Sequence, residues 1–183
     1  MKRREALELT ATIIGGSIVG SGVFLSGCTV AKRGQAPLSE EDVRLLDDIG
    51  ETILPESDTS PGAKAAHIGE FMRTMVRDCY DEQEASIFMA GLAEVREASQ
   101  AAYSRSLQDL SSDQRQDLLA PFDRIARSES EGEQVHFFAM MKQLTIWGYF
   151  TSEPGVTKAL RYNPVPGRYD GCVEYAPGET AWA

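Results

Sequence analysis

The residue whose setting most clearly predicts a chemical modification is Cys28, the last residue of the sequence Leu25-Ser26-Gly27-Cys28. This sequence resembles a bacterial lipobox, in which small residues precede a cysteine that is acylated and becomes the new N-terminus. One acyl chain binds a membrane only reversibly, so stable attachment needs more than one, and a lipobox cysteine typically carries several. Cys28 is therefore the predicted lipidation site and the predicted first residue of the mature chain.

An export signal is predicted upstream of that cysteine. Arg3 and Arg4 stand shortly before a Gly-rich, uncharged apolar stretch at residues 9–24. The stretch is too short and too rich in Gly, Ser and Thr for a membrane span, which needs about 20 predominantly apolar residues, and it fits a signal peptide. Paired arginines at this place resemble a twin-arginine signal, which exports folded proteins, although Ala6 and Glu8 depart from that motif.

These patterns predict how the N-terminal part of the chain is organised. Residues 1–27 are expected to be a twin-arginine-type lipoprotein signal peptide and residues 28–37 a tether, so that the mature protein is attached to a membrane in the periplasm. An uncleaved helix that anchors the chain is the alternative. The glycines of this region do not follow the G-x-G-x-x-G spacing of a dinucleotide loop, and no βαβ unit is evident around them.

Histidine and carboxylate side chains occur at one spacing that could bind a metal. Glu133 and His136 form an E-x-x-H pattern, which is half of a di-iron site that needs a second such pair and two more carboxylates. The other histidine, His67, precedes Glu70 in the reverse order. We therefore predict no metal site and expect His136 to pack or to cap a helix. No catalytic and no cofactor-binding residue is predicted, because no nucleophile–base set is recognisable.

Two further cysteines, Cys79 and Cys172, would lie in an oxidising compartment where disulfides are permitted. Cys79 falls on the apolar face of an expected helix and reads as a core residue, whereas Cys172 lies in an irregular segment and reads as exposed. A bond between the two would fix that segment to the helical domain, and a bond from Cys172 to another subunit would link two chains. The sequence leaves both bonds open, with free thiols as a third possibility.

Helical periodicity dominates the chain beyond the tether. Apolar residues recur at spacings of three and four in six segments that we predict as helices. Their expected bounds are about 39–54, 68–80, 81–106, 111–127, 133–149 and 152–160. Ser39, Asp81 and Ser111 are the predicted N-caps, and Pro121 is expected to kink or divide the fourth helix. The fifth helix is the most apolar and is expected to lie centrally.

The predicted fold class is all-α. No segment shows the clean alternation of polar and apolar residues that a half-buried strand requires. We expect a single domain of five to six helices over residues 38–162, followed by an irregular C-terminal arm over residues 163–183 that is rich in Pro, Gly and aromatic residues.

The acidic composition limits the partners of this domain. The chain has 18 Lys and Arg residues against 28 Asp and Glu residues, a formal net charge of −10. Such a charge repels nucleic acid and anionic lipid headgroups. Nucleic acid is therefore excluded as a partner, and contact with a membrane is expected through the lipid anchor.

Two blocks of sequence resemble the gluconate 2-dehydrogenase subunit 3 family. The early block is residues 51–66 (ETILPESDTSPGAKAA), and the late block is residues 144–162 (LTIWGYFTSEPGVTKALRY), which continues into residues 163–172 (NPVPGRYDGC). The resemblance extends over most of the mature chain and includes the twin-arginine leader. A lipobox cysteine is not a feature expected of every member, so the lipid anchor is a departure from the family pattern.

The resemblance implies an accessory role without catalysis. Proteins of this family are small subunits of membrane-associated dehydrogenases that oxidise sugars, sugar acids or polyols. The catalytic partner is a large flavoprotein of the glucose-methanol-choline (GMC) type that holds FAD, often joined by a multihaem cytochrome c with haem c. The small subunit is thought to carry the export signal for the pair and to help the flavoprotein mature. No cofactor is expected on this chain.

The C-terminal region is the predicted surface for docking to that partner. Tyr and Arg are enriched where interfaces gain their energy, and the candidate docking residues there are Tyr149, Phe150, Arg161, Tyr162, Arg168, Tyr169 and Cys172. The arm could equally wrap around its own domain, which a single sequence does not distinguish. The alternative function is a stand-alone periplasmic lipoprotein that acts as a binding or scaffold module.

Overall fold

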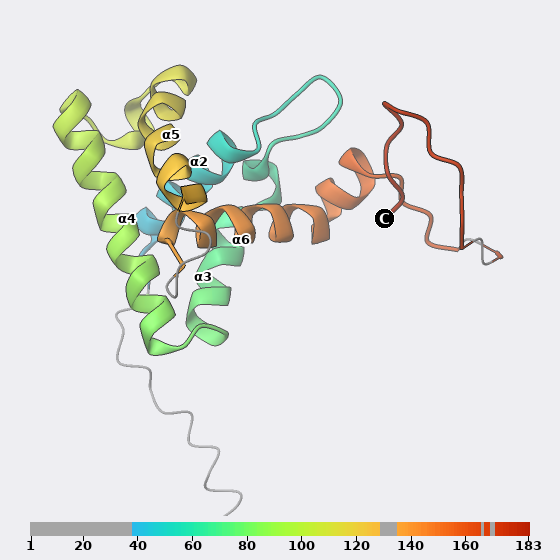
Figure 1. The fold of residues 1–183 in the computed structure, drawn as a ribbon, viewed down its shortest axis with the longest axis horizontal. Helices are drawn as coiled ribbons and strands as arrows, with labels where there is room; N and C mark the ends of the chain where they lie inside the picture. The colour runs from blue at the N-terminus through green and yellow to red at the C-terminus, as the bar shows by residue number, and fades with distance from the viewer. Residues whose placement is uncertain (1–37, 129–134, 166, 169–170) are drawn as a thin grey trace, which may run out of the picture. The chain divides into compact units, whose positions relative to one another are not determined.

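The computed structural model describes residues 38–128, 135–165, 167–168 and 171–183, and these residues form an all-α fold (Figure 1). The five α-helices are α2 (Glu40–Ile53), α3 (Ile68–Asp78), α4 (Glu82–Tyr103), α5 (Ser112–Ser128) and α6 (Phe137–Thr151). Two 3₁₀ turns, η1 (Ala63–Ala66) and η2 (Leu107–Asp109), and one π-helical turn, η3 (Gly155–Ala159), connect or extend them. The described residues contain no strand, so the predicted fold class is confirmed.

Local hydrogen bonds explain where three of these helices begin. In each case the side chain of the N-cap residue accepts from the backbone N–H three residues on, and the side chain of that residue accepts from the N–H of the cap. This arrangement satisfies backbone donors that the first helical turn leaves without a partner. The three capping boxes are Ser39 with Asp42, Asp81 with Glu84, and Ser111 with Gln114. The predicted caps of α2, α4 and α5 are confirmed.

Helix α6 lies at the centre of the fold, as its apolar sequence predicts. It packs against all four of the other described α-helices (Figure 1). Met141 and Thr145 on α6 are completely buried, and the Thr145 hydroxyl donates to the Met141 carbonyl at 2.8 Å, so this buried polar group has a partner. Gly148 lets α6 approach α3 closely, because a Cβ atom there would lie 2.5 Å from both Ile68 Cδ1 and Phe71 Cδ1.

Helix α5 contains Pro121, where a kink or a division of the helix was predicted. The helix runs without interruption from Ser112 to Ser128, so the proline does not divide it. Pro121 is exposed, whereas its neighbours Leu118, Leu119 and Phe122 are buried. Burial of this apolar face compensates for the single backbone hydrogen bond that a proline removes.

The two ends of α6 also differ from the expected bounds. The helix begins at Phe137 rather than near residue 133, with His136 as its N-cap. After Thr151 the chain forms the π-helical turn η3 where an α-helix was predicted. Gly155 allows this path, because a Cβ atom at this position would collide with the Tyr149 carbonyl oxygen.

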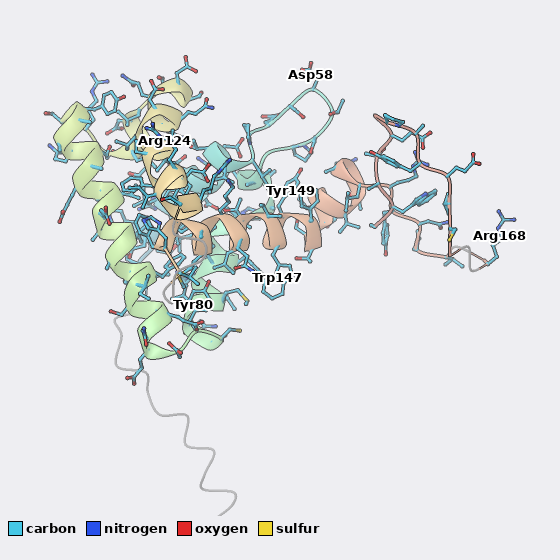
Figure 2. All side chains as sticks on the ribbon, viewed as in Figure 1. Asp58, Tyr80, Arg124, Trp147, Tyr149 and Arg168 are labelled. Carbon is cyan, nitrogen blue, oxygen red and sulfur yellow. The ribbon has the colours of Figure 1, made fainter. Side chains whose placement is uncertain are left out.

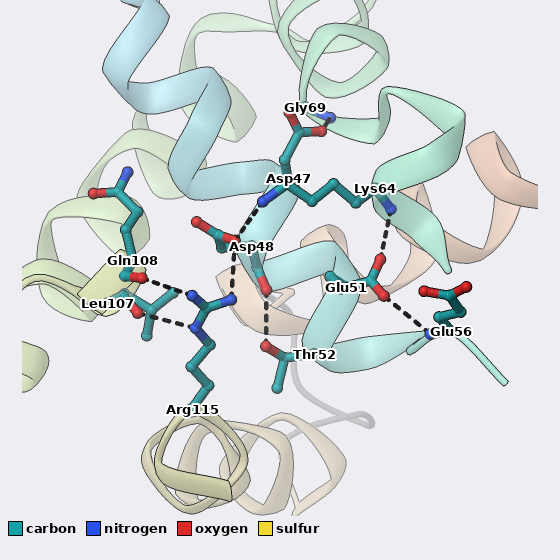
Figure 3. A network of polar contacts seen from close by, with 10 residues as sticks. All are labelled: Asp47, Asp48, Glu51, Thr52, Glu56, Lys64, Gly69, Leu107, Gln108 and Arg115. Carbon is teal, nitrogen blue, oxygen red and sulfur yellow. Dashed lines mark hydrogen bonds and ion pairs between the residues drawn. The ribbon is translucent and has the colours of Figure 1, made fainter. Parts of the chain in front are cut away.

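Acidic side chains of α2 hold the surrounding segments in place (Figure 3). The buried carboxylate of Asp48 accepts from Arg115 Nη1 of α5 at 2.9 Å and from Lys64 Nζ of η1 at 3.0 Å. Asp47 accepts from the Gly69 N–H at 2.8 Å, and Glu51 accepts from the Lys64 N–H at 2.8 Å. Burial raises the pKa of Asp47, and the hydrogen bond from Gly69 offsets only part of this rise. Helix α2 therefore fixes the positions of η1, α3 and α5.

Several predictions fall on residues outside this description. They are the signal peptide with Arg3 and Arg4, the tether with Cys28, and the docking candidate Tyr169. Among the described residues, no helix has both the length and the apolar character needed to cross a membrane.

Candidate docking surface

Helix α6 has an exposed apolar face, although its apolar sequence predicts a helix buried at the centre of the fold. Ile146, Trp147 and Phe150 are 41%, 52% and 37% exposed, although Leu144, Thr145 and Tyr149 on the same helix are buried. Positions 146, 147 and 150 follow helical spacing and therefore share one side of α6. Figure 2 shows Trp147 projecting away from the helix on the side opposite to Tyr149. Trp147 also meets Phe71 of α3 edge to face, with ring centroids 6.0 Å apart.

This apolar face forms one wall of a groove between α5 and α6, which we call the α5–α6 groove. Its volume is about 610 Å³, and it is open to solvent. Helix α6 contributes Ala139, Ile146, Trp147 and Phe150, and α5 contributes Ala126. An open apolar groove of this kind is typical of surfaces that bind a protein segment.

Charged side chains form one part of the groove wall. Asp123 of α5 accepts from Lys142 Nζ of α6 at 2.6 Å and pairs with Arg127 Nη2 at 2.7 Å. The hydrogen bond from Lys142 lowers the pKa of Asp123, burial opposes this shift, and Arg127 adds to it. One carboxylate thus faces two cations, so this part of the groove has an excess of positive charge.

Tyr149 is not part of a docking surface, which corrects the prediction. Its ring is 3% exposed, and its hydroxyl donates to the Pro61 carbonyl and lies 2.6 Å from Ser60 Oγ. Tyr149 therefore fixes the loop that joins α2 to η1, whose tip carries Asp58 (Figure 2). Helical spacing explains the difference from its neighbour Phe150, because adjacent residues of a helix point about 100° apart.

The remaining docking candidates divide between the groove and the arm. Phe150 lines the groove. Arg168 and Cys172 are exposed in the C-terminal arm, Tyr162 is exposed directly before it, and Arg161 precedes Tyr162. The structure thus separates residues that the sequence analysis had grouped into one surface. The exposed Ile146 and Trp147, which that analysis assigned only to an apolar helix, were missed as surface residues.

Arg161 joins the two ends of the arm. Its N–H donates to the Ala181 carbonyl at 2.8 Å, and its carbonyl accepts from the Ala183 N–H at 3.2 Å. Its guanidinium carbon lies 4.8 Å from the centre of the Trp182 ring and its Nη2 lies 3.8 Å from Glu179. Between these contacts, the described residues of the arm form no helix and no strand.

Both described cysteines are exposed and free, so the structure contains no bond between Cys79 and Cys172. The prediction that Cys79 is a core residue is wrong. Helix α3 ends at Asp78, and Cys79 is its C-cap, beyond the last turn whose apolar face is buried. Its Sγ lies 3.9 Å from the sulfur of Met75. A bond from Cys172 to a partner subunit stays a prediction.

The E-x-x-H pattern does not lie on a helix as expected. His136 precedes α6, and its Nδ1 accepts from the Phe138 N–H at 3.2 Å, so the predicted capping role is confirmed. Glu133 lies outside the described residues. His67 takes a left-handed backbone conformation between η1 and α3. The part of the chain that the structure describes has no group of three or more His, Cys, Asp or Glu side chains placed to hold a metal.

Comparison with known proteins identifies the family. The sequence model of gluconate 2-dehydrogenase subunit 3 matches residues 40–167. The chain belongs to this family. Neither the curated proteins nor the solved structures contain a match to the chain.

The extent of the match to the gluconate 2-dehydrogenase subunit 3 family separates the two exposed regions. It includes α2, α6 and every residue that lines the α5–α6 groove. It ends at residue 167, so Cys172 and Trp182 of the arm lie beyond it. The groove is thus part of the region by which the family is recognised. Most of the arm is not.

Proposed function

We propose that this chain is the non-catalytic small subunit of a periplasmic dehydrogenase complex. Its partner would be a large GMC-type flavoprotein that holds FAD and oxidises sugars, sugar acids or polyols, and a multihaem cytochrome c is a further candidate subunit. The observation that carries the proposal is the match to gluconate 2-dehydrogenase subunit 3 over residues 40–167. The exposed apolar face of α6 supports it, because contiguous exposed apolar side chains mark surfaces that bind other proteins.

The leader has two roles in this proposal. Arg3 and Arg4 would direct the folded complex through the twin-arginine route, which suits a flavoprotein that binds FAD before export. A catalytic subunit without its own signal could then be exported together with this chain. Cys28 would attach the exported complex to the membrane through its acyl chains. The helical domain would have a separate role in maturation, since the partner would fold around FAD in contact with this subunit.

The test is to search the neighbouring reading frames for a large flavoprotein and to co-express it with this chain. The expected result is a co-purified pair that contains flavin and that reduces an artificial dye with a sugar, sugar acid or polyol. Omitting this chain should leave the flavoprotein in the cytoplasm or without activity. If no flavoprotein is encoded nearby and none co-purifies, the stand-alone lipoprotein remains and the proposal is wrong.

Two substitutions separate anchoring from export. The Cys28→Ala variant should release an active complex into the soluble periplasm, because no acyl chain can be attached. An Arg3→Lys, Arg4→Lys variant keeps the positive charge of the leader but should stop export by the twin-arginine route. A Cys28→Ala complex that stays in the membrane would assign attachment to a cytochrome subunit or to an uncleaved leader.

A further inference from the structure

We propose that the α5–α6 groove binds an amphipathic helix of the partner protein, with apolar residues on the face that enters the groove and acidic residues beside it. This inference rests on the proposed function in that it requires a protein partner. It goes further by assigning the docking site to the groove instead of the arm and by specifying the chemistry of the docked segment.

The apolar character of the groove comes from a helix that would otherwise be buried on all sides. A helix that is apolar around its whole circumference is normally enclosed by protein. Around α6 the buried sides meet α2, α3, α4 and α5, and one side remains open at Ile146, Trp147 and Phe150. Phe150 lies four residues after Ile146 and three after Trp147, so the three side chains form a single apolar strip. A second helix can pack its own apolar side chains against this strip.

The charges at the groove favour an acidic occupant. Among the described residues that line it, Asp123 is the one acidic side chain, and it is shared by Arg127 and Lys142. Arg127 is also 73% exposed and can reach a second carboxylate. This excess of positive charge occurs in a chain whose formal net charge is −10. Complementary charge at the edge of an apolar contact directs the choice of partner.

The shape of the groove favours a polypeptide over a small molecule or a lipid surface. A small ligand is normally buried over most of its surface, and this groove is open along its length. A bilayer is flat and cannot fill the hollow between α5 and α6. A helix suits a groove that is open to solvent, because its side chains form ridges that fit into a groove.

The chain's two tryptophans allow the groove and the arm to be observed separately. Trp147 lines the groove and Trp182 lies in the arm. A Trp182→Phe variant of the full chain therefore reports on the groove, and a Trp147→Phe variant reports on the arm. The probe is a synthetic helical peptide of about four turns with Leu at positions i, i+3, i+4 and i+7 and Glu elsewhere. A second peptide with Lys in place of Glu is the matched control.

Fluorescence titration gives the first test. In the Trp182→Phe variant, the Glu peptide should shift Trp147 emission to the blue and saturate, and the Lys peptide should bind at least about tenfold more weakly. In the Trp147→Phe variant, the emission of Trp182 should not change. Equal binding of both peptides, no shift of Trp147, or a shift produced only by phosphatidylcholine–phosphatidylglycerol vesicles would overturn the inference.

Co-purification of the complex gives the second test, with one apolar-to-acidic substitution in each region. Ile146→Glu places a carboxylate in the groove and should lower recovery of the flavoprotein about tenfold or more. Val173→Glu places the same group on an exposed residue of the arm and should leave recovery unchanged. If only Val173→Glu reduces recovery, the partner binds the arm and the groove inference is wrong. If peptide binding occurs but no flavoprotein is ever recovered, the groove inference stands and the proposed function fails.

Discussion

The α5–α6 groove and the C-terminal arm both expose aromatic side chains, but different forces hold them in place. In the groove, Trp147 belongs to a helix whose other sides are buried against four helices. In the arm, Trp182 is held by a pair of backbone hydrogen bonds to Arg161 and by a cation–π contact. The groove is therefore formed by helices that pack in the core, and the arm is a loop closed at one point.

This difference has a consequence for binding. A surface whose side chains are already fixed loses little conformational entropy when a partner docks, whereas a loop must be ordered at a free-energy cost. The groove is thus suited to determine affinity, and the arm is suited to add contacts once the complex has formed. The comparison also predicts that changes in the core alter the groove and leave the arm unchanged.

The largest expected effect comes from Asp48, whose buried carboxylate links α2 to Arg115 of α5 and to Lys64 of η1. Asp48→Ala removes the ion pair with Arg115 and leaves that partly buried guanidinium without its anionic partner. We expect the free energy of unfolding to fall by about 3 kcal/mol, as measured by urea denaturation followed by circular dichroism. Asp58→Ala, at the exposed tip of the loop after α2, is the control and should change nothing. Equal stability of the two variants would show that the network in Figure 3 does not support the core.

A pair of glycine substitutions should separate the two regions directly. Gly148→Ala puts a methyl group against Ile68 and Phe71, and the overpacking should cost roughly 2 kcal/mol and change the Trp147 emission. Gly178→Ala introduces the same methyl group into open space in the arm, at a backbone φ of +92°. It should strain only the arm and leave the unfolding transition of the domain in place. A loss of domain stability in Gly178→Ala would mean that the arm is part of the cooperative unit.

The ion pairs at the groove predict a pH dependence. The folded-state pKa of Asp123 is lowered, so its stabilising contribution is present above the unfolded-state value of about 3.8 and is lost as the pH falls through the folded-state pKa. Asp123→Asn should therefore reduce the free energy of unfolding by about 0.5 kcal/mol at neutral pH, and this difference should vanish in acid. Urea titrations of both proteins across this range measure it. The folded-state pKa of Asp47 is raised, so its effect has the opposite sign. Its contribution to the free energy of unfolding falls as the pH rises.

The smallest effect on stability is expected at Arg161. Arg161→Ala removes the cation–π contact with Trp182 and the ion pair with Glu179, both at the surface, so the free energy of unfolding should change by less than about 0.5 kcal/mol. In a Trp147→Phe background, acrylamide should nevertheless quench Trp182 more strongly once the contact is lost. Lys158→Ala, on the preceding turn η3, is the control. Unchanged quenching would show that the backbone hydrogen bonds alone close the arm.

Much of the fold was predictable from local sequence signals. The caps Ser39, Asp81 and Ser111 were predictable because each capping box needs only residues three positions apart. The all-α class followed from apolar spacing. Pro121 does not divide α5, because the cost of a proline inside a helix is local, whereas the burial of Leu118, Leu119 and Phe122 that outweighs it depends on tertiary contacts.

The candidate site was less predictable. Aromatic composition directed the sequence analysis to the arm and to Tyr149, but burial of Tyr149 against the loop at Ser60 and Pro61 excludes that residue. Nothing in the sequence distinguishes the exposed Trp147 from the buried Tyr149, since both stand in one apolar run. A helical-wheel projection of α6 places Trp147 and Tyr149 on different sides. The projection does not show which side the other helices cover.

The sequence by itself determined the family, the helical class and the starts of α2, α4 and α5, because these depend on residue types and their order along the chain. It also predicts a leader with Arg3, Arg4 and Cys28. The tertiary structure decided which apolar residues remain exposed. Four helices enclose α6 and leave the strip at Ile146, Trp147 and Phe150 uncovered, and one carboxylate, Asp123, brings two cations to its edge. Burial depends on which distant segments meet, and that information exists only once the chain has folded.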